Sequence, residues 1–154
     1  FTSAFSSRGV PGNVIGKDGK AAFGPSNAFA HFGYKINSKE EIICFDIRTV
    51  NVTGDYHSHV FTATHIGQGA AGALGTPRIA FPNPVHVRTD HTGAEIRESK
   101  GCLQGPFMTN FTLNGVDTGS NSGFTLSQIE ANPSGFLTDT HTTDYIHGAV
   151  RGQL

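Results

Sequence analysis

No apolar run in the 154-residue sequence approaches the ~20 residues that a membrane-spanning helix needs. The longest apolar stretches are short and interrupted by charges, as in "EEIICFDI". An excess of charge of one sign is also missing, because 11 basic and 12 acidic residues are mixed along the chain. We therefore expect a soluble protein without a membrane span and without the charged surface that nucleic acid requires. The length fits a single domain over residues 1–154.

Cysteine is scarce, with only Cys44 and Cys102. An even count in a secreted domain favours one disulfide between them, which would stabilise the fold by about 4 kcal/mol. The alternative is two buried free thiols in a cytosolic protein. A disulfide would also remove the thiolate that a blue-copper site needs, so the pairing argues against a cupredoxin.

Several features favour secretion over a cytosolic location. The sequence contains two glycosylation acceptors, "NVT" at Asn51 and "NFT" at Asn110. It begins at Phe1 rather than at methionine, as expected after removal of a signal peptide. The sequence therefore predicts an extracellular glycoprotein.

Helical patterns are nearly absent, whereas glycine, phenylalanine, threonine and valine are frequent. One short helix is expected over residues 125–133, where Thr125 and Gln128 have the spacing of a capping box and Pro133 ends the pattern. Residues 85–106 are polar and are expected to form a long loop. Strands are expected over residues 28–36, 41–52, 59–66, 78–81, 107–113, 135–142 and 148–154. This pattern predicts an all-β Greek-key sandwich or barrel.

The stretch "THIGQGAAGALGTP" has the G-x-G-x-x-G spacing of a dinucleotide-binding loop. Such a loop works only where it leads into a helix whose N-terminal amides bind the phosphates. Here Gly75, Pro77, Pro82 and Pro84 prevent a helix from following. The glycines therefore indicate a compact turn. Signatures of a serine hydrolase are also missing, because "GSNSG" has Asn121 where the nucleophilic serine would stand.

Histidine is frequent, with eight copies, and the most informative are those near predicted strands. If residues 57–65 form one regular strand, then His57, His59 and His65 share a face, since side chains two apart point the same way. Clustered neutral imidazoles suit Zn(II) or Cu(II). Solvated or hydrogen-bonded histidines are the alternative for each residue taken alone. The spacing of His86, Asp90 and His91 would suit a second zinc-type site, but a solvated loop fits these residues better.

Two motifs, "ATHIGQGAAGALGTP" and "FLTDTHTTDYIHGAVRGQL", resemble those of the CHRD domain, a module named for its occurrence in chordin and also found in secreted microbial and fungal proteins. The resemblance covers about residues 32–84 and 124–154, and it implies an immunoglobulin-like β fold. The motifs are also similar in order to the copper-binding histidines of copper/zinc superoxide dismutase. By that similarity His65 and His141 would be metal ligands from distant strands.

One position departs from the family motif, which reads A-H-I-H where this chain has "THIG". Gly67 therefore replaces the second histidine. Either the site is lost, or His57 and His59 supply replacement nitrogens. The second option predicts a site of His57, His59, His65 and His141, holding copper in preference to zinc. Asp139 or Asp144 would orient one imidazole.

Two functions remain open from the sequence. One is a secreted metal-binding protein acting in metal homeostasis or oxidative-stress handling, with superoxide dismutation possible at an open copper site. The other is a non-catalytic extracellular module that contacts cell-wall polymer or a protein partner. A metal titration separates them.

Overall fold

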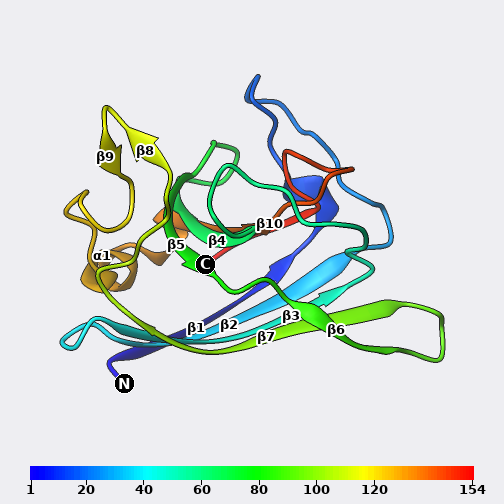
Figure 1. Ribbon diagram of the computed structural model, residues 1–154, viewed down its shortest axis with the longest axis horizontal. Coiled ribbons are helices and arrows are strands. Elements are labelled where there is room, and N and C mark those ends of the chain that lie inside the picture. The colour runs from blue at the N-terminus through cyan, green and yellow to red at the C-terminus, as the bar shows by residue number, and fades with distance from the viewer.

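Two antiparallel sheets pack face to face in the computed structural model, which describes residues 1–154 (Figure 1). The larger sheet has the order β1 (Ser3–Gly9), β2 (Phe29–Asn37), β3 (Ile42–Val50), β7 (Glu95–Gln104), β6 (Val85–Thr89). The smaller sheet has the order β11 (Val150–Gln153), β10 (Phe136–Thr140), β4 (Thr64–Gln68), β5 (Thr76–Phe81). The chain changes sheet after β3, after β5 and after β7. This confirms the predicted all-β sandwich, although the sheets do not close into a barrel.

Short elements complete the fold. A two-stranded hairpin joins β8 (Thr112–Leu113) to β9 (Val116–Asp117). One α-helix, α1 (Leu126–Ala131), and the 3-10 turns η1 (Pro11–Asn13) and η2 (Pro133–Gly135) are the only helical segments. None of these helices has the length and apolar character needed to cross a membrane.

Alternation along the strands builds the core between the sheets. In β2 every second residue is buried, from Ala30 through Phe32 and Tyr34 to Ile36. These side chains meet Ile66 and other apolar residues of the smaller sheet in one hydrophobic cluster. Tyr34 reaches across the sandwich, where its hydroxyl lies 2.9 Å from that of Thr138 on β10. The inner faces of both sheets are therefore used for packing, which leaves function to the outer faces and loops.

The predicted disulfide is confirmed. Cys44 on β3 lies directly opposite Cys102 on β7, and the two residues are covalently joined. The bond links neighbouring strands of the larger sheet, and no free cysteine remains. A thiolate ligand is thus unavailable anywhere in the chain.

The predicted long loop over residues 85–106 is wrong. These residues form β6 and β7, and β7 is the longest strand, paired with β3 over nine residues. All five residues of β6 are exposed, and β7 buries only Ile96 and Ser99. Most residues of these two strands are exposed to solvent and are polar. The alternation of apolar and polar residues that would mark a strand in the sequence is therefore weak.

Three further expectations need correction. The segment 59–66 becomes a strand only at Thr64, and most of 107–113 is not strand. The strand β1 was not predicted, because its half-exposed edge position leaves a mostly polar sequence.

The Thr125 side chain makes no capping hydrogen bond. Instead the Glu41 carboxylate accepts the backbone N–H of Leu126, at 3.1 and 3.2 Å from its two oxygens. A tertiary contact therefore replaces the local capping box.

Candidate metal centre

The outer face of the smaller sheet places a histidine opposite an aspartate. His65 on β4 is the register partner of Asp139 on β10. Their neighbours in sequence, Ile66 and Thr138, point into the core. Since side chains alternate along a strand, His65 and Asp139 point together to the other side. His141 follows the end of β10 with the same parity as Asp139, so the sheet brings three polar side chains to one place.

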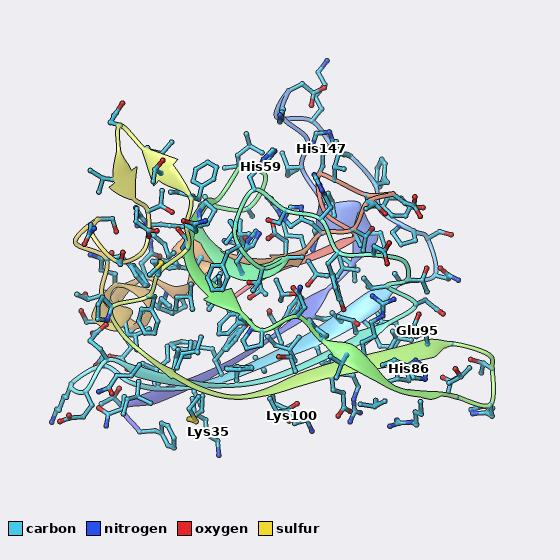
Figure 2. The ribbon with its side chains drawn as sticks, viewed as in Figure 1. Lys35, His59, His86, Glu95, Lys100 and His147 are labelled. Carbon is cyan, nitrogen blue, oxygen red and sulfur yellow. A yellow bond between two sulfur atoms is a disulfide. The ribbon has the colours of Figure 1, made fainter.

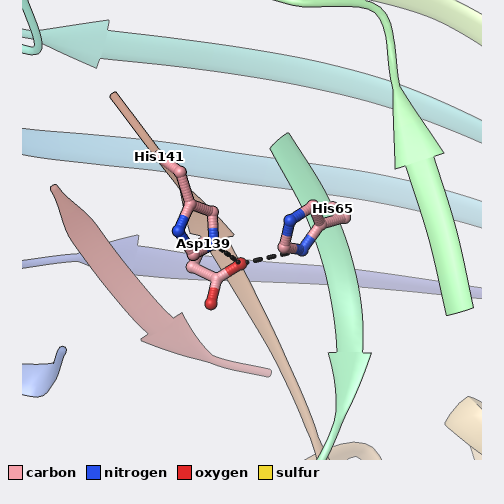
Figure 3. Close-up of side chains that lie close together, drawn as sticks. All are labelled: His65, Asp139 and His141. Atoms are coloured by element: carbon pink, nitrogen blue, oxygen red, sulfur yellow. Dashed lines mark ion pairs between the residues drawn. The ribbon is translucent and has the colours of Figure 1, made fainter. Parts of the chain in front are cut away.

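Three donor atoms of these residues converge (Figure 3). Asp139 Oδ1 lies 2.9 Å from His65 Nδ1 and 3.2 Å from His141 Nε2. The side chains are 5% to 14% exposed, so all three are largely withdrawn from water. Two ligands of a tetrahedral Zn(II), each bound at 2.0–2.1 Å, would be about 3.3 Å apart. These two separations are close to that value, and all three donor atoms lie within 4.8 Å of one another.

Both contacts of Asp139 Oδ1 with the imidazoles are short ion-pair contacts. Asp139 Oδ1 and His141 Nε2 are both buried and neither has a hydrogen-bond partner. Buried polar atoms are rarely left unpaired, because each costs about 1–3 kcal/mol. A carboxylate oxygen and imidazole nitrogens gathered in this way are also donor types that a transition-metal ion binds.

Hydrogen bonds on the far side of each imidazole fix its orientation. His141 Nδ1 donates to the carbonyl oxygen of Ile146 at 2.9 Å, so Nε2 is the nitrogen that faces Asp139. His65 Nε2 lies 3.4 Å from the hydroxyl of Ser58, which leaves Nδ1 facing Asp139. This division between one coordinating and one hydrogen-bonded nitrogen is usual for metal-bound histidine.

Arg151 on β11 holds the second carboxylate oxygen. Its Nη2 donates to Asp139 Oδ2 at 3.1 Å, and Arg151 itself is buried. Burial acts to raise the pKa of Asp139, but the neighbouring imidazoles of His141 and His65 outweigh it and hold that pKa well below its usual range. Burial also acts to lower the pKa of His141, and the Asp139 carboxylate outweighs it so that the pKa is raised. Asp139 is thus ionised, with Oδ2 held by Arg151 and Oδ1 facing the two imidazoles.

The glycine-rich segment covers this face. Gly67 and Gly75 pack closely against each other and against Leu137, and a Cβ on Gly67 would make a tight contact of 3.3 Å with Gly75 Cα. Arg151 donates to the carbonyl of Ala73 at 2.7 Å, and Gln153 donates to that of Gly69 at 2.8 Å. No helix follows the segment, which agrees with the expected turn. The "RGQL" side chains therefore hold the loop beside the site.

The structure places His57 and His59 differently from the expected strand. They lie in the irregular segment between β3 and β4, so the assumption of one regular strand from His57 to His65 is wrong. Both are exposed, with ring centroids 6.1 Å apart, and neither belongs to the group of three converging donors. They do line the same cavity as His65 and His141. Figure 2 shows His59 and His147 at the end of the molecule opposite Lys35 and Lys100.

The remaining predicted residues lie elsewhere. His86 sits 3.4 Å from Glu95 on the β6–β7 hairpin (Figure 2), and Asp90 accepts hydrogen bonds within the turn of that hairpin. Asp144 is exposed and outside the donor cluster. Asn110 is an exposed loop residue, whereas the Asn51 side chain donates to the carbonyl of Asn27. Glycosylation at Asn51 and Asn110 stays a prediction.

The sequence reasoning named Asp139 only as an orienting group and did not single out Arg151. The signal for Asp139 was present in "TDTH", because a residue two positions before His141 shares its face on a strand. Nothing local marked Arg151, since its partner Asp139 is fixed only by the pairing of β10 with β11.

Comparison with curated proteins and with solved structures found no match for this chain. The family model for the CHRD domain, in contrast, matches residues 13–154. The match includes the segment 85–106 and both motifs that carried the resemblance, and it omits only the first twelve residues, which contain β1. The chain therefore belongs to the CHRD domain family.

Proposed function

We propose that this protein binds one transition-metal ion through His65, Asp139 and His141. The observation that supports it most strongly is the convergence of three withdrawn donor atoms, two of which have no hydrogen-bond partner. Arg151 neutralises the second oxygen of Asp139 and fixes the carboxylate. In this proposal His57 and His59 flank the open side of the ion.

The donor set suits Zn(II) and Cu(II). Two imidazoles and one carboxylate are common zinc ligands, and imidazole also binds Cu(II) strongly. The resemblance to the superoxide dismutase motifs favours copper, so copper is the first candidate. CHRD domains are generally extracellular, where the protein would capture the ion or handle oxidative stress.

Elemental analysis of the purified protein, followed by calorimetric titration of chelator-treated protein with Cu(II) and Zn(II), tests the proposal. We expect one ion per chain with a dissociation constant well below millimolar. His65→Ala and His141→Ala should abolish this binding, while His86→Ala should retain it because His86 lies on the distant β6–β7 hairpin. The electron paramagnetic resonance spectrum of the Cu(II) form should show coupling to two nitrogens.

Circular dichroism of each variant separates loss of a ligand from loss of the fold. A folded His65→Ala that binds copper as tightly as the unaltered protein would overturn the proposal. So would an unaltered protein that carries no metal and titrates with neither ion. A superoxide assay on the copper-loaded protein then distinguishes capture from catalysis.

A second candidate function is that of an extracellular binding module. The edge strand β6 pairs only with β7, and its residues are all exposed, including Val85 and Val87. An exposed edge with apolar side chains can accept a strand from a protein partner. Affinity capture with the unaltered protein and with Val87→Lys tests this function. Capture of the same protein by both would count against it.

A further inference from the structure

The donor cluster of His65, Asp139 and His141 lines a cavity of about 260 Å³. The lining also includes residues from five loops that are distant in sequence. One of these is the N-terminal loop with Lys17, which Figure 1 shows beside the segment after β10; Gly148 and Val14 are in contact there. The cavity gives a small molecule direct access to the proposed ion.

Three protein donors leave such an ion with an open position. Structural zinc sites have four protein ligands, whereas sites that take an exchangeable ligand have three. The group that converges here has three members, and no fourth acidic, histidine or cysteine side chain joins it. The three donor side chains all line the cavity, so we expect the open position to face it.

The charges around the cavity favour an anion. Asp139 is the only acidic residue in its lining, and Arg151 is paired with it. Lys17 is exposed and lines the cavity without an ion-pair partner, together with His57, His59 and His147. A carboxylate bound to the ion would therefore meet mostly positive or neutral groups, since the one acidic neighbour, Asp139, is paired with Arg151.

Apolar side chains form another part of the wall. Leu74 is 52% exposed and Ile146 is 55% exposed, and both line the cavity. Val60 and Phe111 lie in the same lining. Exposed aliphatic side chains beside a few polar donor groups are typical of a site that covers the hydrocarbon part of a ligand.

We infer that the cavity binds a small aromatic or branched carboxylic acid, whose carboxylate occupies the open position of the ion and whose apolar body packs on Leu74 and Ile146. This inference rests on the proposed metal site. The volume lies just below the range of cavities that hold drug-sized ligands, so one ring or a short branched chain is the size that fits.

Titration with benzoate tests the inference, with acetate and benzyl alcohol as probes that lack the apolar body or the charge. The protein is loaded with one equivalent of Cu(II) or Zn(II), freed of excess metal, and studied by calorimetry. Benzoate should bind at least about tenfold more tightly than either probe, and at least about tenfold more tightly than to metal-free protein.

Variants locate the binding. Leu74→Ser combined with Ile146→Ser should weaken benzoate about tenfold, and Lys17→Gln should weaken it about threefold. The matched control is Leu113→Ser, because Leu113 is 51% exposed on the β8–β9 hairpin and lies outside the cavity. It should leave benzoate binding unchanged. Metal content is measured for every variant.

The outcomes separate the inference from the metal site on which it depends. Metal-loaded protein that binds benzoate no better than acetate and benzyl alcohol would overturn the inference and leave the metal site standing. Equal binding to metal-free protein, or equal loss in Leu113→Ser, would also overturn it. Failure of the unaltered protein to take up metal would overturn both.

Discussion

Arg151 and Asp139 form a buried ion pair across the neighbouring strands β11 and β10, with Nη2 and Oδ2 3.1 Å apart. The same guanidinium holds the glycine-rich loop through the carbonyl of Ala73. One side chain therefore fixes both the carboxylate of the donor cluster and the loop beside it. This connection explains how the C-terminal motif and the glycine motif serve one site.

Replacing Arg151 should be strongly destabilising. Arg151→Met leaves the buried Oδ2 of Asp139 without its cationic partner, and we expect a loss of about 3–5 kcal/mol in the free energy of unfolding, measured with urea on metal-free protein. Arg48→Met breaks the more exposed pair with Glu98 and should cost less than about 1 kcal/mol. Equal losses of unfolding free energy in the two variants would show that burial does not make the Arg151–Asp139 pair more important for stability.

Metal should raise thermal stability. At a free concentration of 100 times the dissociation constant, an ion that binds only the folded state adds about 2.7 kcal/mol. For a chain of this size the Tm should rise by about 5–10 °C and return when a chelator is added. His65→Ala should show no rise, and His86→Ala should behave as the unaltered protein. A rise in His65→Ala would place the ion elsewhere.

Acid should weaken the loop that Asp117 organises. Its carboxylate accepts backbone N–H groups of Thr109, Asn110, Gly119 and Ser120, which outweigh burial and lower the pKa of Asp117 from 3.8 to about 2. A lowered pKa stabilises the fold fully above pH 3.8, and this contribution is lost as the pH falls through 2.

The matching substitution is Asp117→Asn. It should reduce the free energy of unfolding by about 1–2 kcal/mol at pH 6, because one charged acceptor is lost. The difference from the unaltered protein should shrink as the pH approaches 2, which denaturant titrations at several pH values can follow. A difference that is constant over pH would contradict the role of the charge.

Removing the disulfide should affect stability but not metal binding. Cys44→Ser with Cys102→Ser opens a link with a sequence separation of 58 and should cost about 2–4 kcal/mol. The bond lies in the larger sheet, whereas the donor cluster lies on the smaller one. Metal affinity of the folded variant should therefore be unchanged. A large loss of affinity would show that the two sheets are coupled.

Restoring the histidine of the family motif should not repair the site. Gly67→His directs an imidazole toward Gly75 and Leu137, where even a Cβ is close to its limit. We expect a loss of about 1–3 kcal/mol, as for other overpacked positions, and no gain in copper affinity. Unchanged stability with tighter copper binding would show instead that the glycine-rich loop moves and makes room for the imidazole.

Sequence reasoning succeeded where burial imposes a pattern. The strands β2 and β3 were predicted because their inward side chains are apolar, and the pairing of Cys44 with Cys102 because no other cysteine is available. It failed at β6, β7 and β1, whose residues face solvent and carry little pattern. Sequence reasoning also wrongly extended the strand of His65 back to His57. His57 and His59 have the spacing of residues on one face of a strand, but they lie in a loop.

The sequence by itself determined the all-β class, the disulfide, the CHRD resemblance and the histidines His65 and His141. Only the tertiary structure decided which side chains lie beside these two histidines. Asp139 converges on both imidazoles because β4 pairs with β10 in one register, and Arg151 reaches Asp139 because β11 pairs on the other side. Strand register brings together residues that are far apart in the chain, and a shift of one position would turn Asp139 into the core.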